Sequence, residues 1–145
     1  MLIDKDELVG KDEKAILRVF IEQVTKSEDE IEDKTTRQGK DTDLKIYVAD
    51  KKGFEIGRLR NHLQQLVNNQ AARKSARDFV QEHSFEEELL NENISFVSIH
   101  TSSYNRTDEF VFIDRDEYLW VLTTERSKWT EATIEKLLKY LPNLK

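Results

Sequence analysis

The sequence predicts a mixed α and β (α+β) fold, with a single mixed four-stranded sheet that ends in a C-terminal antiparallel hairpin and is covered by three to four helices. Apolar residues recur at helical spacing near both ends and in the middle of the chain. Between these segments lie short apolar runs rich in β-branched and aromatic residues, and two of the runs flank a polar turn. The predicted order is α-β-α-(α)-β-β-β-α, and 145 residues fit a single domain, 1–145.

The first predicted element is an amphipathic helix over residues 11–32. Its apolar positions are four or seven residues apart, which places them on one face of a helix. These positions are Ile16, Phe20, Val24 and Ile31. The next segment, residues 33–43, contains no apolar side chain, so we expect a flexible surface loop between this helix and the sheet.

A short strand is predicted over residues 44–49, where the sequence LKIYVA alternates in character. Helical spacing returns from residue 55 to residue 82, which predicts one long central helix with a buried apolar stripe. Ser84 is followed three residues later by Glu87, which is the spacing of a capping box. We therefore expect a further short helix that runs through Leu90.

Three strands and a helix are predicted in the last third of the chain. They cover residues 94–100, 109–114, 118–123 and 129–141. The second and third of these strands form a hairpin that is apolar on both faces, so we expect cover on both sides from helices or from a second subunit. Trp120 and Trp129 fall on the apolar period of their elements and are expected in the core.

Composition excludes several classes of protein and site. The chain has no cysteine, which excludes disulfides, thiolate zinc sites and iron–sulfur clusters. Its four glycines fit neither a dinucleotide-binding nor a phosphate-binding glycine loop. No apolar run approaches the roughly 20 residues of a membrane span, and the N-terminus is acidic where a secretory signal is basic and then apolar. We therefore expect a cytoplasmic protein without membrane contact, cofactor, metal site or catalytic residues.

The net charge of −6 conceals a segregation of charge along the chain. Residues 34–82 hold 11 basic and 6 acidic residues, whereas residues 1–33 hold 5 basic and 11 acidic ones. Residues 83–119 hold 2 basic and 9 acidic residues. A basic middle of the chain thus lies between two acidic segments, which face either one another or a partner.

The polar face of the predicted central helix is the main candidate for function. Polar and basic residues recur there every three or four positions, from Arg58 to Arg77, which would align them along one helix face. Arginine and amide side chains suit contacts with phosphates and base edges. We therefore expect a non-catalytic interaction or regulatory module that associates with DNA or RNA. The residues assigned to this contact are Arg58, Arg60, His62, Asn69, Arg73, Lys74 and Arg77.

Two alternatives stay open. The first is a protein–protein module, such as an inhibitor, immunity-type or adaptor protein or an obligate dimer, because the acidic segments suit a basic partner and the apolar hairpin suits a second copy. The second is a metal-dependent nuclease or phosphodiesterase that uses Asp114 and Asp43. Asp43-Leu44-Lys45 has the acid-x-lysine spacing of metal nucleases, which need a second acid nearby in space.

Overall fold

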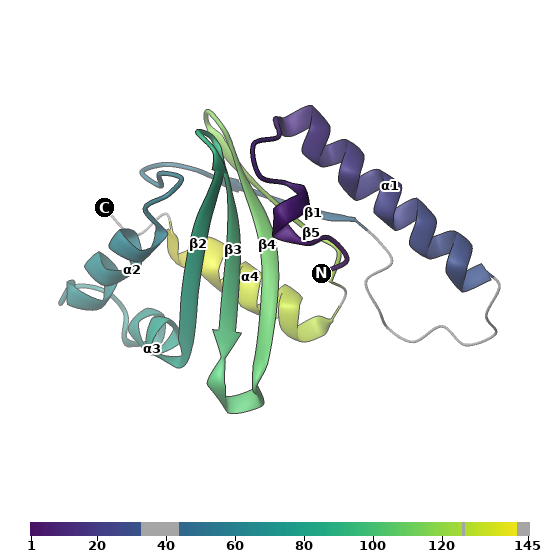
Figure 1. The fold of residues 1–145 in the computed structure, drawn as a ribbon. Helices are drawn as coiled ribbons and strands as arrows, with labels where there is room; N and C mark the ends of the chain where they lie inside the picture. The colour runs from purple at the N-terminus through teal and green to yellow at the C-terminus, as the bar shows by residue number, and fades with distance from the viewer. Residues whose placement is uncertain (33–43, 126, 142–145) are drawn as a thin grey trace.

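A five-stranded antiparallel sheet forms the centre of the structure (Figure 1). The computed structural model describes residues 1–32, 44–125 and 127–141, and the elements below are those of this part of the chain. The helices are α1 (Glu13–Glu32), α2 (Leu59–Asn68), α3 (Lys74–Glu82) and α4 (Lys128–Tyr140), with short 3-10 helices η1 (Lys5–Glu7) and η2 (Ser102–Tyr104). The strands are β1 (Lys45–Asp50), β2 (His83–Asn91), β3 (Ile94–Thr101), β4 (Arg106–Arg115) and β5 (Tyr118–Thr123), in the sheet order β1-β5-β4-β3-β2. None of the helices described is long and apolar enough to cross a membrane.

Helices cover both faces of the sheet because its middle strand, β4, is apolar on both. Phe110 and Phe112 point into a core that α2, α3 and α4 share. Val111 and Ile113 point into a second core, shared with α1 and the segment that precedes it. All four side chains are at most 1% exposed. The predicted cover on both sides is confirmed, and helices of the same chain provide it (Figure 1).

The elements at both ends of the chain form near their predicted positions. In α1, the predicted inward residues Ile16 and Phe20 are fully buried. Strands β1, β3, β4 and β5 and helix α4 also lie close to their predicted ranges. The side chain of Ile31 and the loop predicted over residues 33–43 lie outside the described residues.

The mixed four-stranded sheet is a wrong prediction, because the short helix expected through Leu90 is strand β2. β2 pairs with β3 along its whole length, from His83 opposite Thr101 to Asn91 opposite Ile94. The pairing of β2 with β3 outweighs the helical preference of Glu86, Glu87 and Glu88 in the middle of β2, since tertiary pairing overrides local propensity. The sheet therefore has a fifth strand, and all of its pairings are antiparallel.

Glu87 caps a helix, although not the helix that the spacing from Ser84 predicted. From strand β2, its carboxylate accepts hydrogen bonds from the backbone N–H of Gly57 at 2.8 Å and of Leu59 at 2.9 Å. The hydroxyl of Ser95 donates a third hydrogen bond, at 2.7 Å. A negative charge at a helix N-terminus is stabilising, so Glu87 fixes the start of α2 against the sheet.

The long central helix is also a wrong prediction, because the chain leaves the helical conformation between Asn69 and Arg73. Asn69 ends α2 with extended backbone angles, and Arg73 is extended again just before α3. The side-chain oxygen of Asn69 accepts a hydrogen bond from the backbone N–H of Ala71 at 3.0 Å. Asparagine forms such local turns in competition with the helix, and the result is a pair of short helices.

We predict that Glu87→Ala lowers the free energy of unfolding by about 1–2 kcal/mol, because two N–H groups at the start of α2 lose their acceptor. Urea denaturation of the purified variant measures this loss. Glu86→Ala, on the exposed face of the same strand, is the matched control and should stay within about 0.5 kcal/mol of the unmodified protein. Equal losses for the two variants would contradict the assignment of Glu87 as the cap.

Candidate functional site

The residues predicted to contact nucleic acid lie in two separate groups. Arg58, Arg60 and His62 are at the start of α2, and the others are at the turn after α2 or in α3. Those others are Asn69, Arg73, Lys74 and Arg77. The ten residues of α2 hold the two groups about 15 Å apart, so the single row expected on one helix does not exist.

The group at the start of α2 makes contacts within the protein. The Arg58 guanidinium lies 3.4 Å from the carboxylate of Glu55, and both side chains are exposed. Arg60 donates from Nε to the carbonyl oxygen of Phe85 at 3.2 Å. His62 accepts a hydrogen bond at Nε2 from the backbone N–H of Glu55 at 3.1 Å. Burial is the main cause that lowers the pKa of His62, which favours the neutral ring at this position.

Two residues of the second group, Asn69 and Arg73, line a pocket at the turn between α2 and α3. Arg73 and Lys74 are exposed, whereas Asn69 is half-buried and forms the turn itself. Arg77 is half-buried, and its Nε makes no hydrogen bond within the described part of the chain. The pocket has a volume of about 410 Å³ and is lined by Asn69, Arg73, Lys139 and Tyr140, with apolar residues of α2 and α3. Among the described residues, the two charged ones that line the pocket, Arg73 and Lys139, are both basic.

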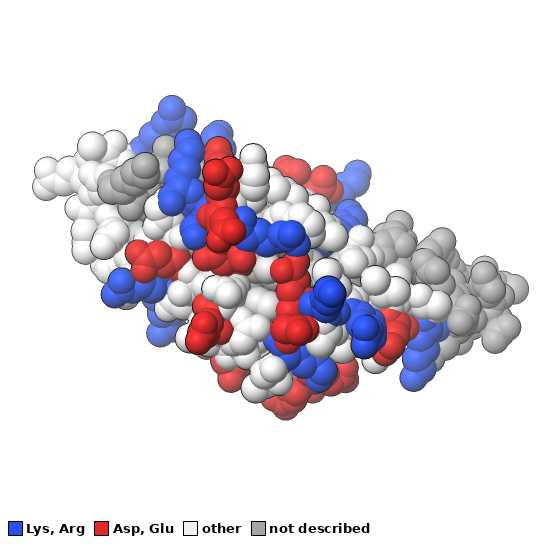
Figure 2. Space-filling view, turned by 90° about the horizontal axis from the view of Figure 1, so that it is seen from above, with Lys and Arg blue, Asp and Glu red and all other residues white. Residues whose placement is uncertain are grey.

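The acidic helix α1 does not neutralise these basic residues. It packs on the face of the sheet opposite to α2 and α3, as the two separate cores show (Figure 1). On the face that Figure 2 presents, blue and red side chains alternate, and no broad area carries one sign. The segregation of charge along the sequence therefore does not produce a single basic surface on that face.

A larger pocket, of about 580 Å³, is lined by residues of β2, β3, η1 and the start of α2. Three of its carboxylates already have partners. Glu87 caps α2, Glu88 lies 2.8 Å from the ammonium of Lys5, and Glu109 lies 3.5 Å from the amino group of Met1. The contact with Glu88 is also the main cause that raises the pKa of Lys5. The contacts of Lys5 with Glu88 and of Met1 with Glu109 hold the N-terminal segment on the sheet.

The residues of the metal-nuclease alternative do not gather. Asp114 accepts two hydrogen bonds from the ammonium of Lys51, at 3.0 and 2.9 Å, and one from the backbone N–H of Asp116. Asp43 lies outside the described residues. Among the residues that the structure describes, no three His, Asp or Glu side chains are placed to hold a metal ion.

The most exposed aromatic side chains of the described residues, Tyr104 and Trp129, lie against each other. Tyr104 ends η2 and is 62% exposed, and Trp129 begins α4 and is 55% exposed. Their ring centroids are 4.8 Å apart with an angle of 40° between the planes. The prediction that Trp129 packs in the core is wrong, because Thr130 takes the inward position in register with Ile134 and Leu137. Trp120 packs partly against the second core, and the guanidinium of Arg115 covers its ring at 4.3 Å.

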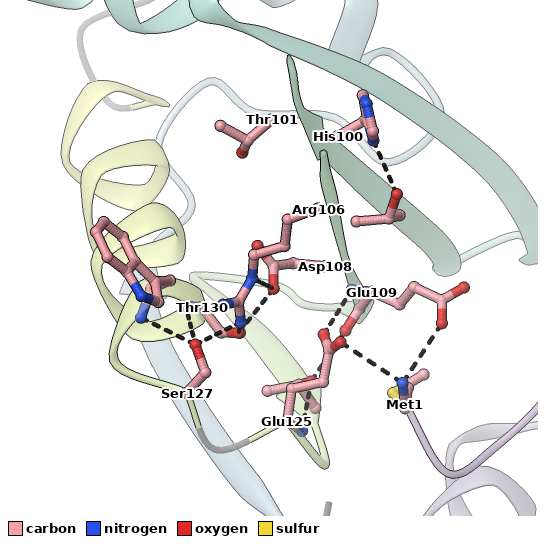
Figure 3. A network of polar contacts seen from close by, with 12 residues as sticks. Met1, His100, Thr101, Arg106, Asp108, Glu109, Glu125, Ser127 and Thr130 are labelled. Carbon is pink, nitrogen blue, oxygen red and sulfur yellow. Dashed lines mark hydrogen bonds and ion pairs between the residues drawn. The ribbon is translucent and has the colours of Figure 1, made fainter. Parts of the chain in front are cut away.

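An ion pair between half-buried Arg106 and buried Asp108 links the elements that carry the two rings (Figure 3). Arg106 follows Tyr104 by two residues and donates from Nε to Asp108 at 3.1 Å. The same guanidinium donates from Nη2 to the hydroxyls of Ser127 and of Thr130, the second at 2.7 Å. Ser127 is the N-cap of α4 and accepts from the backbone N–H of Trp129 at 3.0 Å. Arg106 thus connects the turn that bears Tyr104 to the helix start that bears Trp129.

Asp108 is fully buried, and its carboxylate is the hydrogen-bond acceptor at the centre of this network. Its Oδ1 accepts from Arg106 and from the hydroxyl of Thr130 at 2.7 Å, while Oδ2 has no hydrogen-bond partner among the described residues. His83 lies on the same face, with Nδ1 at 2.8 Å from the hydroxyl of Thr101. Burial is the first cause and nearby Lys136 a further one that lowers the pKa of His83, against the opposing charges of Glu82 and Asp108.

Glu109, the residue after Asp108 in β4, points to the opposite face of the sheet, because side chains alternate along a strand. The backbone N–H of Glu109 donates to the carboxylate of Glu125 at 2.7 Å. Both carboxylates lie near the amino group of Met1, at 3.5 and 3.6 Å (Figure 3). The start of β4 is therefore tied to α4 on one face and to the N-terminal segment on the other.

We predict that Arg106→Ala lowers the free energy of unfolding by about 3–5 kcal/mol at pH 7, because it leaves the buried carboxylate of Asp108 without its counter-charge. Asp108→Asn should cost less, about 1.5–3 kcal/mol, because Arg106 is partly exposed and retains its hydroxyl acceptors. Urea denaturation measures both values. Arg58→Ala, which removes an exposed pair, should change stability by less than about 1 kcal/mol. A loss of unfolding free energy for Arg106→Ala that is no larger than the loss for Arg58→Ala would contradict this role of Arg106.

Comparisons of the chain with protein-family models, with curated proteins and with solved structures find no match. The function of this chain is therefore argued from its own surface. Of the features above, the pair formed by Tyr104 and Trp129 and the basic pocket at Arg73 are the two that offer exposed groups to a partner.

Proposed function

We propose that the chain is a non-catalytic interaction module that recognises a protein partner through the rings of Tyr104 and Trp129. The carrying observation is that two large aromatic side chains, each more than half exposed, lie together on a support fixed by Arg106. Trp, Tyr and Arg are the residue types most enriched among those that dominate protein–protein binding energy. Exposed apolar groups that lie together, rather than singly, are typical of interaction sites.

The energetics of the pair favour a role in binding. A fully buried aromatic side chain covers roughly 150–250 Å², so the exposed half of each ring represents on the order of 2–3 kcal/mol at about 25 cal/mol per Å². The bonds from Arg106 to the N-cap of α4 hold the helix start in place before any partner arrives. Such preorganisation lowers the entropy lost on binding.

A protein surface with an apolar recess fits the pair better than a nucleic acid does. Bases also stack on exposed aromatic rings, but such sites add positive charge to follow the phosphate backbone. Here the guanidinium adjacent to the rings is paired with Asp108. The aromatic pair therefore offers apolar contact more than a binding site for phosphate.

We predict that a photo-crosslinking amino acid placed at Tyr104 captures a defined protein from nuclease-treated extract of the native host, and that Trp129→Ala in the same chain abolishes the capture. Calorimetry with the purified partner should then show that Trp129→Ala alone weakens binding by at least about 30-fold, the effect of 2 kcal/mol. Trp129 is exposed, so the variant should unfold at nearly the same urea concentration as the unmodified protein.

The matched control places the same crosslinker at Ile21, which is 58% exposed on α1 and belongs to neither proposed binding surface. Capture of the same protein from Ile21, or equal affinity of the Trp129→Ala variant, would contradict the proposal. Capture that disappears only after nuclease treatment would replace the protein partner with a nucleic acid.

A second candidate function is nucleic-acid association through the pocket at the turn between α2 and α3. The observation that favours it is the meeting of Arg73 and Lys139 at this pocket, beside exposed Lys74. Arg73 is the N-cap residue of α3 and gives it no side-chain cap, and a helix N-terminus favours anions. Phosphate is the ligand group that this chemistry suits.

For this second candidate, we predict that fluorescence anisotropy with labelled single-stranded RNA and duplex DNA shows binding at low salt. Arg73→Glu combined with Lys74→Glu should abolish it, because each lost phosphate contact reduces the salt dependence by about one unit of slope. Arg58→Glu, at a residue already paired with Glu55, is the control and should bind almost as the unmodified protein does. Absence of binding at about 50 mM salt would remove this candidate.

A further inference from the structure

Strand β1 is an open edge of the sheet. Within the described residues its only neighbour is β5, with which it pairs in regular antiparallel register from Lys45 opposite Thr123 to Asp50 opposite Tyr118. Alternate residues of such a strand turn their N–H and C=O groups away from the sheet. These groups can accept a further strand.

One face of this edge is apolar and exposed. Ile46, Val48 and Tyr118 are 43%, 56% and 49% exposed, and we name these three residues the β1 patch. The register places Val48 opposite Trp120 and Asp50 opposite Tyr118, so the three side chains lie on the same face as neighbours. Helix α1 covers the middle of this face and leaves the β1 patch uncovered.

The middle of the edge lacks several of the features that prevent pairing with another chain, while Lys45 and Asp50 place charges at its two ends. Proline, a bulge or a charge in the middle of the strand protects many natural edges. The middle of β1 reads Ile-Tyr-Val-Ala, and its pairing with β5 contains no register shift.

We propose that the β1 edge pairs with the β1 edge of a second copy of this chain, to join the two sheets into one. A two-fold axis perpendicular to a sheet places residues of the same face opposite each other. With Tyr47 opposite its own copy, Ile46 lies opposite Val48 of the other chain and Val48 opposite Ile46, so both exposed side chains gain an apolar neighbour. Lys45 then lies opposite Ala49, and no like charges meet.

The symmetric register centred on Val48 is unfavourable. With Val48 opposite its own copy, Ile46 would lie opposite Asp50 and Lys45 opposite Lys51 of the other chain. Like charges placed directly opposite each other destabilise a pair of strands. The edge is therefore complementary to itself in the register centred on Tyr47, which covers the β1 patch and brings no like charges together.

The interface is small, because β1 has six residues. Interfaces at the low end of the size range are weak and reversible, so we expect a dissociation constant on the order of 1–100 µM. This pairing is separate from the cover of the hairpin, which helices of the same chain provide.

Sedimentation over about 0.5–500 µM tests the proposal, since this range brackets the expected dissociation constant. The unmodified protein should shift from the mass of one chain toward twice that mass. Val48→Lys should remain monomeric throughout, because it places an ammonium opposite Ile46 of the other copy. Leu89→Lys is the matched control, since Leu89 is 55% exposed on β2 at the other edge of the sheet, and it should dimerise as the unmodified protein does.

A cysteine variant tests the register. The chain contains no cysteine, so in Tyr47→Cys the new thiol has only its own copy as a partner. Mild oxidation should give a disulfide-linked dimer much faster than it does for the control Leu89→Cys. A monomeric unmodified protein at the highest concentration, self-association of Val48→Lys equal to that of the unmodified protein, or equal crosslinking of the two cysteine variants would each overturn the proposal.

Discussion

The structure depends on the burial of β4 on both faces. Four consecutive residues, from Phe110 to Ile113, alternate between two cores and are all at most 1% exposed. A strand of this kind is stable only with a layer of helices on each side. Helices α2, α3 and α4 therefore cover one face, and α1 with the N-terminal segment covers the other (Figure 1). The candidate binding surfaces lie where this arrangement ends: at the start of β4, at the outer edge strand and at the turn between α2 and α3.

The two surfaces proposed for binding differ in physical character. Tyr104 and Trp129 are large rings held by a buried charge network that starts in β4, so their support belongs to the rigid centre of the protein. Strand β1 offers backbone groups and aliphatic side chains at an edge that is complementary to itself. The first surface suits a different protein with an apolar recess, and the second suits another copy of the chain. Because they belong to different elements, substitutions at one surface should leave the other intact.

The sequence predicts the parts of the fold in which local pattern and tertiary packing agree. Ile16 and Phe20 lie inward as their spacing requires, and the hairpin is covered on both faces as its apolar residues require. The predictions fail where tertiary contacts outweigh local pattern: pairing with β3 makes a strand of residues that include three glutamates, and Asn69 turns the chain in the middle of a helical pattern. The aromatic pair could not be predicted, because it depends on a contact between Arg106 and Thr130 across 24 residues. The available signal was the Ser127 N-cap, which places Thr130 rather than Trp129 on the inward face of α4.

The central functional claim is that Tyr104 and Trp129 lie against each other in the free protein, held by the bonds from Arg106. Nuclear Overhauser spectroscopy of the unliganded chain tests this claim most directly. We expect strong ring-to-ring contacts between Tyr104 and Trp129. We also expect the amide proton of Thr130 to exchange slowly, because it donates to the hydroxyl of Ser127 in the first turn of α4. Absence of these ring contacts in a spectrum in which the two side chains are assigned would contradict a preformed pair.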